Sequence, residues 1–158
     1  RWDIPLPYRA ELEHAEAIEQ RLEQWQQQEE EARLREDLPH AQHCRAMAER
    51  DRRLLAKLAE LPPGENYPYQ VHAWQLGDAI WLLLPGEPYQ QLQQELRARF
   101  PEIPLLIASN TGPWGPSYLV PDESYGKGIY QETVAVLEAG CLEELTTHLA
   151  ERIADWIE

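Results

Sequence analysis

The chain has 158 residues, enough for one domain with a sizeable hydrophobic core and too few for two domains of ordinary size. Its 28 acidic residues outnumber its 14 basic ones, and the resulting net charge of −14 argues against nucleic acid and anionic membrane surfaces as partners. No apolar run approaches the roughly 20 residues of a membrane span, so no transmembrane segment is predicted. Because the chain opens at Arg1 and its only methionine is Met47, we expect it to be a piece of a longer protein.

The first part of the sequence is predicted to form two helices. From Ala10 to Leu38 it is rich in Glu and Gln, and its apolar residues recur at helical spacing. A break at Leu38-Pro39 leads into a second helix, which ends at "LPPGENYP". Residues 1–64 are therefore predicted to be a helical hairpin arm. The stripe of Leu12, Ile18, Leu22 and Trp25 should pack on Met47, Leu54, Leu55 and Leu58 or on the sheet.

After Tyr67 the hydrophobic period changes from that of a helix to that of strands. Residues 69–76 and 79–84 read as a β-hairpin around Gly77-Asp78, and 105–108 read as a third strand. Helices are predicted over 88–100 and 142–158. The fold class is thus α/β: an N-terminal helical hairpin, then a small mixed sheet with a βαβ unit and a C-terminal helix, the α/β portion covering residues 65–158.

The βαβ unit indicates where a site could lie. Its two strands run parallel, so both carboxyl ends open on one side of the sheet, where ligands of open α/β sheets bind. Glu87, which follows the first of these strands, and the loop that starts at Ser109 should therefore be near neighbours. Two interpretations of Glu87 remain open: a cap for the helix that begins at Pro88, or a ligand for a metal or substrate.

The loop from Ser109 to Tyr130 is long for a compact domain and carries four aromatic residues: Trp114, Tyr118, Tyr125 and Tyr130. A loop of this length is functional or disordered as a rule, and the aromatic rings argue against disorder. It is interpreted either as a lid packed on the sheet or as a loop that lines a site. Cys44 and Cys141 match no metal or redox spacing and are predicted to be buried thiols. His40 and His43, three residues apart, are read as surface residues near a helix start.

Four stretches resemble one known family: "LGDAIWLLLPGEPYQQL", "LLIASNTG", "SYLVPDESYGKGIYQET" and "AGCLEELTTHL". They are similar to the C-terminal part of the neutral/alkaline, non-lysosomal ceramidase-like zinc amidohydrolases, over about Tyr67 to Glu158. In that family the "GD-apolar strand-PGE" segment supplies a zinc-binding glutamate, which corresponds to Glu87. A tyrosine after an Asn-containing loop supplies a further ligand, which corresponds to Tyr118, with Tyr125 as the substitute.

The resemblance implies zinc as cofactor and hydrolysis of an N-acyl amide as in sphingolipid metabolism, with zinc activating a water and Tyr118 acting catalytically by holding the oxyanion. The family's histidine ligands lie in an earlier part of the domain, so the implied partners are the N-terminal part of the same protein and a lipid-like N-acyl amide. The chain by itself is then expected to be inactive. Relatives are often secreted or periplasmic. The alternative is a non-enzymatic scaffold or partner-binding domain that kept the fold without the metal.

Overall fold

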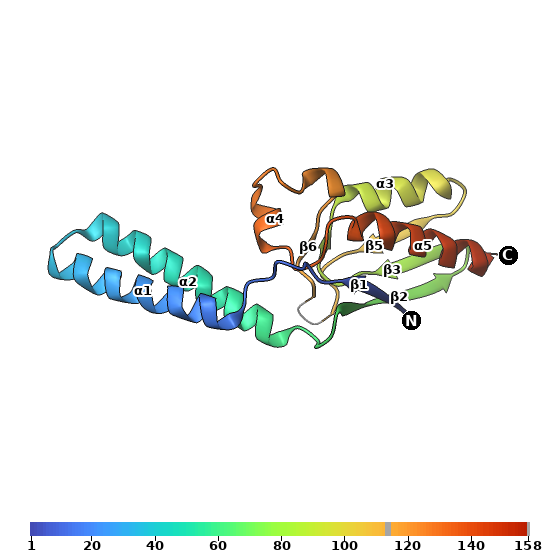
Figure 1. Cartoon of the computed structure of the whole chain (residues 1–158). Coiled ribbons are helices and arrows are strands. Elements are labelled where there is room, and N and C mark those ends of the chain that lie inside the picture. The colour runs from blue at the N-terminus through green and yellow to red at the C-terminus, as the bar shows by residue number, and fades with distance from the viewer. Residues whose placement is uncertain (113–114, 158) are drawn as a thin grey trace. The chain divides into compact units, whose positions relative to one another are not determined.

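The computed structural model describes residues 1–112 and 115–157 and divides the chain into two compact units (Figure 1). One unit is Glu11–Leu61, and the other combines Arg1–Ala10 with the chain from Pro62 onward. The predicted α/β class is confirmed, with a helical pair, a mixed four-stranded sheet and a C-terminal helix. Within the described part of the chain, no helix is both long enough and apolar enough to cross a membrane.

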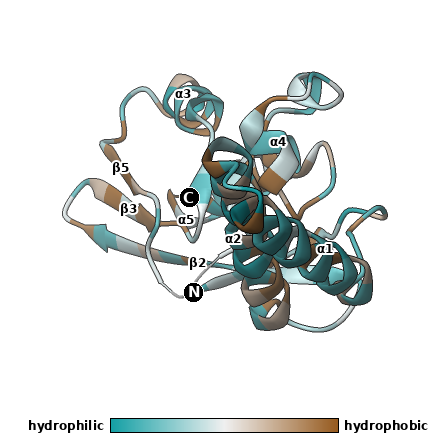
Figure 2. Ribbon diagram, turned by 90° about the vertical axis from the view of Figure 1, so that its left-hand side faces the viewer, coloured by the Kyte–Doolittle hydropathy of each residue, from teal (hydrophilic) through white to brown (hydrophobic). Residues whose placement is uncertain are grey.

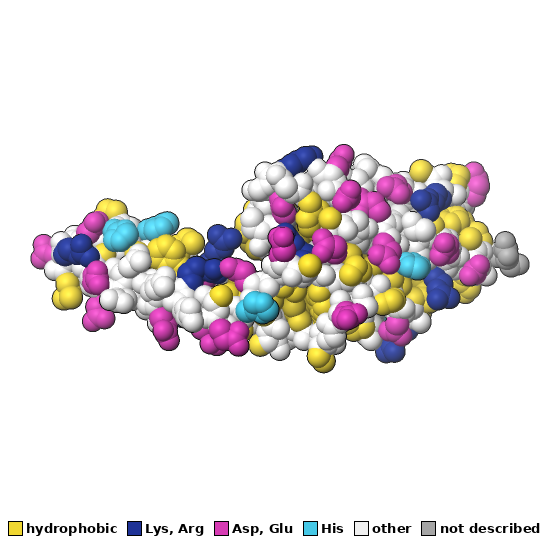
Figure 3. Space-filling model, in the orientation of Figure 1, with side chains coloured by type: hydrophobic (Ala, Val, Ile, Leu, Met, Phe, Trp, Pro, Cys, Tyr) yellow, Lys and Arg dark blue, Asp and Glu magenta, His cyan; other side chains and the backbone are white. Residues whose placement is uncertain are grey.

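The first unit is a helical hairpin of α1 (Ala15–Leu34) and α2 (Leu38–Glu60). Asp37 begins α2 as its N-cap, because its side chain accepts a hydrogen bond from the backbone N–H of His40 at 3.2 Å. Small and aliphatic side chains fill the interface of the two helices, and the fully or almost fully buried ones are Ile18, Ala32, Ala41, Cys44 and Ala48. Both helices are otherwise largely hydrophilic (Figure 2), and acidic side chains are spread over the surface of both units (Figure 3).

A half-buried ion pair, in which only the acidic partner is fully buried, joins the two helices of the hairpin. Arg21 of α1 donates two hydrogen bonds to the carboxylate of Asp51 of α2, from Nε at 2.9 Å and from Nη2 at 2.8 Å. This forked geometry is the strong form of an arginine–carboxylate contact. The Asp51 side chain is only 3% exposed, whereas that of Arg21 is 34% exposed and also contacts Glu13. The pair therefore satisfies a carboxylate that has little access to water.

The sheet of the second unit has the strand order β1-β2-β3-β5. These strands are β1 (Trp2–Pro7), β2 (Asn66–Leu76), β3 (Ala79–Leu83) and β5 (Leu105–Ala108). The predicted β-hairpin is confirmed as antiparallel β2–β3, and the predicted βαβ unit as parallel β3–β5 joined through α3 (Gln90–Arg99).

Strand β1 differs from the sequence prediction, which placed all of residues 1–64 in the hairpin arm. Residues 1–10 belong instead to the α/β unit, where β1 pairs antiparallel with β2. Ile4 and Leu6 point into the core at 4% and 0% exposure. Proline lacks the N–H that a strand donates to its neighbour, so within sheets it is found on edge strands. Strand β1, which contains Pro5 and Pro7, is an edge strand of this sheet. The same prolines weaken its strand signal in the sequence.

One face of the sheet is covered by α3 and α5 (Cys141–Ile157), which lie on the same side of it in Figure 1. The core between these layers is aliphatic and includes Leu6, Ile80, Leu82, Leu96, Leu145 and Leu149, each at most 1% exposed. Helix α5 begins one residue before the predicted start and runs to Ile157. This burial is the main stabilising contribution to the unit.

The other face of the sheet carries a row of large apolar side chains. Trp74 of β2 lies directly opposite Trp81 of β3, which lies opposite Leu106 of β5. Their exposures are 55%, 39% and 38%. Parallel strands such as β3 and β5 are normally buried on both faces. We call this row of three residues the open sheet face.

Candidate functional site

The segment that follows β3, Leu84 to Glu87, is held by the backbone of the loop that follows β5. Leu84 donates its N–H to the carbonyl of Ala108 at 2.8 Å, and its own carbonyl accepts hydrogen bonds from the backbone N–H and the hydroxyl of Thr111, both at 3.1 Å. Gly86 accepts a further bond from the N–H of Asn110 at 2.8 Å. The two strand ends are thus joined, as the parallel βαβ unit predicted.

Glu87 and Tyr118 are paired residues of a second, two-stranded sheet. It consists of β4 (Glu87–Pro88) and β6 (Tyr118–Leu119), which run parallel with Glu87 opposite Tyr118. Glu87 donates its N–H to Ser117 at 2.8 Å, and Tyr89 donates to Leu119 at 3.0 Å. The prediction that Glu87 lies beside the loop after the third strand is confirmed.

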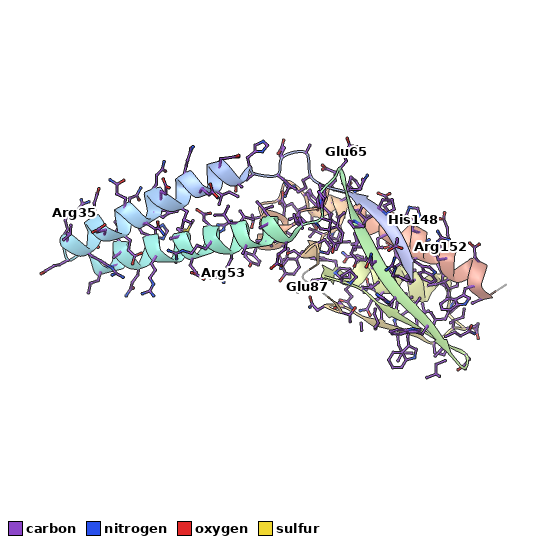
Figure 4. All side chains as sticks on the ribbon, turned by 90° about the horizontal axis from the view of Figure 1, so that it is seen from below. Arg35, Arg53, Glu65, Glu87, His148 and Arg152 are labelled. Atoms are coloured by element: carbon purple, nitrogen blue, oxygen red, sulfur yellow. The ribbon has the colours of Figure 1, made fainter. Side chains whose placement is uncertain are left out.

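The same pairing corrects the predicted start of the following helix. The sequence placed it at Pro88 with Glu87 as its cap, but α3 begins at Gln90 and its N-cap is Tyr89. Because the N–H of Tyr89 is used by Leu119, the chain stays extended through Pro88. Glu87 therefore lies outside the capping position, and it is an exposed residue (Figure 4).

Backbone packing around Gly86 is too tight for any side chain. A Cβ atom on Gly86, whose φ is +68°, would lie 2.5 Å from the carbonyl oxygen of Ser117. A Cβ on Gly115 would lie 2.7 Å from the Gly86 nitrogen. Asn110 and Ser117, which hold this segment from either side, have positive φ values of 57° and 68°. Such outliers are retained when the surrounding structure imposes them, and they gather at functional sites.

Tyr69 supports the segment from within the core. Its ring is fully buried, and its hydroxyl donates a hydrogen bond of 2.6 Å to the carbonyl of Pro85. Burial raises the pKa of Tyr69 well above 10.0, so this hydroxyl stays protonated and remains a donor. The position of Glu87 is thus set by β2 below, by the loop after β5 and by β6 alongside.

The chemistry of the site rests on one carboxylate and two tyrosines. The negative charge of Glu87 raises the pKa of Tyr118, with smaller contributions from burial and from a hydrogen bond to the same carboxylate. Tyr130, the first residue of α4 (Tyr130–Val134), places its ring edge-on to that of Tyr118 with centroids 6.3 Å apart. Tyr130 is 65% exposed. Among the described residues, Glu87 takes part in no ion pair.

Tyr125, the substitute ligand named from the sequence, has a different partner. Its hydroxyl donates to the carbonyl of Leu137 at 3.0 Å, and the guanidinium of Arg9 lies 5.5 Å from the centre of its ring. Burial is the main cause that raises the pKa of Tyr125 to about 12. The ring thus joins the loop to the end of β1 and the strand-like segment at Leu137. Trp114, the fourth aromatic residue of the loop, lies outside the described residues.

The histidines and cysteines have separate surroundings. Both cysteines are free and buried, which confirms the prediction of buried thiols. His40 Nε2 lies 3.7 Å from Cys44 Sγ, and the ring of His43 packs edge-on against Trp25 at 5.9 Å. Over residues 1–112 and 115–157, no group of three or more His, Cys, Asp or Glu side chains is arranged to hold a metal ion. Glu87 and Tyr118 lie opposite each other and bring one carboxylate and one phenol group together.

Two contributors to the site were not singled out from the sequence. Tyr130 was noted only as one of four loop aromatics, and Tyr69 only as a strand residue. Tyr130 could have been found from its place after the "GKG" turn, where a helix start fixes the ring. The hydroxyl of Tyr69 gives no such signal, because its partner is a backbone carbonyl sixteen positions away.

The chain was compared with models of known protein families, with curated proteins and with solved structures, and none of the three comparisons gave a match.

Proposed function

We propose that this chain is the C-terminal part of a zinc-dependent amidohydrolase that resembles the neutral ceramidases and cleaves N-acyl amides. The observation that carries the proposal is the register of the small parallel sheet, which sets Glu87 opposite Tyr118. These are the two residues that the resemblance identifies as ligands. They come from separate segments, so their pairing is independent of the short "PGE" motif.

The donor set fits part of a zinc site. Zinc in catalytic sites takes three protein ligands and leaves one position open, and carboxylate oxygen is one of its ordinary ligands. Glu87 presents an exposed carboxylate that is not occupied by an ion pair among the described residues, and Tyr118 lies beside it. When bound, zinc would supply Lewis-acid activation of a water and of the amide carbonyl.

The chain's own residues would hold and orient the reacting groups. Glu87 would bind the metal through its carboxylate while its backbone stays fixed by Ser117. Tyr118, which lies opposite Glu87, would donate a hydrogen bond from its hydroxyl to the oxygen that becomes negative. Tyr130 would add an exposed aromatic surface for the apolar part of the substrate.

The partner required by this proposal is the N-terminal part of the same protein, which would supply the histidine ligands. The open sheet face supports this, because Trp74, Trp81 and Leu106 form an exposed apolar row on a sheet with a parallel strand pair. Trp81 belongs to β3, the strand that leads to Glu87. A layer packed on the open sheet face would therefore border the site.

The test uses the intact protein and the variant Glu87→Gln. An amide is a poor zinc ligand, so we expect hydrolysis of an N-acyl amide to be lost and zinc content to fall. Tyr118→Phe should slow hydrolysis with a smaller loss of metal. Glu65→Gln, an exposed acid of the same unit, is the matched control and should change neither quantity. Full activity with Gln at position 87 would refute the zinc proposal.

The chain studied alone gives a second test. Because it contributes two ligands, we expect weak zinc binding and no hydrolysis. Calorimetry that shows one tight zinc site per chain would contradict this and would direct attention to His40 and His43.

The alternative function is a non-enzymatic scaffold or partner-binding domain. In it the acidic helices of the hairpin would form the partner-binding arm, and the α/β unit would be a scaffold. It predicts that the intact protein retains neither zinc nor N-acyl amide hydrolysis, and that Glu87→Gln leaves partner binding unchanged. Elemental analysis of the purified intact protein separates the two proposals.

A further inference from the structure

Glu132 clamps the turn that precedes α4. Its two carboxylate oxygens accept the backbone N–H groups of Gly126 and Gly128, each at 2.8 Å. Both glycines have positive φ, 78° and 67°, so the turn has a backbone shape that other residues rarely adopt. The backbone carbonyl of Glu132 in turn accepts a hydrogen bond of 2.9 Å from Arg9. One residue thus links the turn, the helix and the end of β1.

The clamped turn leads directly to Tyr130. Ile129 is the N-cap of α4 and Tyr130 is its first residue, with the hydroxyl of Thr133 donating to the Tyr130 carbonyl at 2.7 Å. The Tyr130 ring is largely exposed, yet it stands edge-on to Tyr118 at 6.3 Å between centroids. An exposed ring has few side-chain contacts to fix it, so its direction depends on the backbone that carries it.

We propose that Glu132 is a positioning residue of the Glu87–Tyr118 site, which holds the exposed ring of Tyr130 against Tyr118 by clamping Gly126 and Gly128. This inference rests on the proposed function for its catalytic consequence and on the hydrogen bonds above for its structural one. In the plain alternative, Glu132 is a capping residue of a five-residue helix and nothing more. The two differ in what happens to the Tyr118–Tyr130 contact when the clamp is released.

The charge state of Glu132 sets when the clamp is closed. The hydrogen bond from Gly126 is the main cause that lowers its pKa below 4.5, with help from Gly128, from the charge of Arg9 and from the N–H of Ile129, against an opposing effect of desolvation. Tyr125 is the other titratable group whose charge couples to Glu132. A carboxylate with a lowered pKa keeps its contacts above that pKa and loses them as the pH falls through it.

The structural experiment compares Glu132→Ala with Glu138→Ala in the chain itself. Glu138 is the matched control, because its carboxylate also accepts two backbone N–H groups, from Ala10 and Ala139, away from Tyr130. The readout is the nuclear Overhauser contact between the rings of Tyr118 and Tyr130. We expect Glu132→Ala to abolish it and Glu138→Ala to keep it, and its persistence in Glu132→Ala overturns the inference.

An acid titration of the unmodified chain covers the case in which Glu132→Ala does not fold. The amide signals of Gly126 and Gly128 and the Tyr118–Tyr130 contact should change together, with one midpoint below pH 4.5, where Glu132 takes up its proton. A ring contact that survives the change in the glycine signals overturns the inference.

The catalytic experiment uses the intact protein and a double-variant cycle. Glu132→Ala and Tyr130→Ala should each lower kcat/KM by roughly tenfold or more, and the double variant should be no worse than Tyr130→Ala alone, because both remove one positioned ring. Full additivity, or wild-type kcat/KM in Glu132→Ala, overturns the inference. If the unmodified intact protein cleaves no N-acyl amide, the proposed function fails instead, and the ring contact still decides the role of Glu132.

Discussion

Asp51 in the helical hairpin and Glu87 in the α/β unit are two carboxylates with opposite surroundings. Asp51 is buried, and its charge is matched by the fork of Arg21. Glu87 is exposed and, within the described residues, has no ion pair, while its backbone is fixed by Ser117 and its neighbours by Asn110 and Leu119. A buried carboxylate paired with a cation serves stability, whereas an exposed carboxylate without a cation, such as Glu87 beside Tyr118, can still take a ligand.

The two regions also differ in the kind of contact that organises them. The hairpin is joined by side chains of adjacent helices, with several exposed i,i+4 pairs on its surface such as Arg53 with Glu49. The site is joined by backbone hydrogen bonds between segments after β3 and after β5. Side-chain pairs tolerate movement of the backbone, and backbone pairs do not. The difference predicts that variants of the two regions fail in different ways.

The largest effect is expected from Arg21→Leu. It leaves the Asp51 carboxylate, with its side chain 3% exposed, without its cation, and breaking a buried pair in this way costs about 3 kcal/mol of unfolding free energy. Arg53→Leu is the matched control, because its pair with Glu49 is 70% and 51% exposed and should contribute less than about 0.5 kcal/mol. Urea unfolding followed by helical circular dichroism measures both. Equal losses in the two variants would show that the pair of Arg21 with Asp51 stabilises the hairpin no more than an exposed pair does.

A slightly smaller loss is expected from Gly86→Ala. The left-handed φ of +68° costs a residue with a Cβ about 1–2 kcal/mol. The Cβ would also lie 2.5 Å from the Ser117 carbonyl oxygen, and moving the backbone apart adds about 1 kcal/mol. Gly77→Ala, at φ +65° with nothing within 4 Å, has the strain without the collision and should lose only the energy of that strain, about 1–2 kcal/mol. Chemical denaturation of the two variants gives the difference. If they are equally stable, the close approach of β4 and β6 does not exist.

A third variant, Tyr69→Phe, removes the donor to Pro85 while keeping the buried ring. The carbonyl left without a partner should cost about 1–2 kcal/mol, in the range expected of an unsatisfied buried acceptor. Tyr125→Phe makes the corresponding change at Leu137 and should cost less, since Tyr125 is not fully buried. Thermal unfolding gives the comparison, and in the intact protein only Tyr69→Phe should also reduce zinc content. A loss of zinc in Tyr125→Phe alone would reverse our assignment of the two rings.

The smallest effect is a shift in one titration. The charge of Glu87 raises the pKa of Tyr118, so Glu87→Gln should move it back toward 10.0, and Glu65→Gln should not. In the unmodified chain the folded state keeps this proton at higher pH than the unfolded state. The corresponding stability is present below pH 10.0 and is lost as the pH rises through the folded pKa, so the loss should be smaller in Glu87→Gln. Nuclear magnetic resonance of the Tyr118 ring measures the titration midpoint in both variants. An unchanged midpoint in Glu87→Gln would show that the charge of Glu87 does not act on Tyr118.

Local pattern by itself determined most of the elements. The period of apolar residues identified both helices of the hairpin, and the alternation around Gly77-Asp78 identified β2 and β3. The third strand was predicted at its observed bounds, 105–108. Burial of one face is a property of consecutive residues, which is why these assignments need no knowledge of distant contacts. The parallel βαβ rule then placed Glu87 beside the following loop.

Tertiary structure decided what no local pattern encodes. Strand β1 forms because it pairs with β2 and buries Ile4 and Leu6 in the core. Its two prolines, Pro5 and Pro7, disfavour a strand. Helix α3 starts two residues later than predicted because the N–H of Tyr89 bonds to Leu119, thirty positions along the chain. The opposition of Glu87 to Tyr118 depends on the same long-range pairing. A sequence states which groups each residue offers, and the fold decides which of these groups meet.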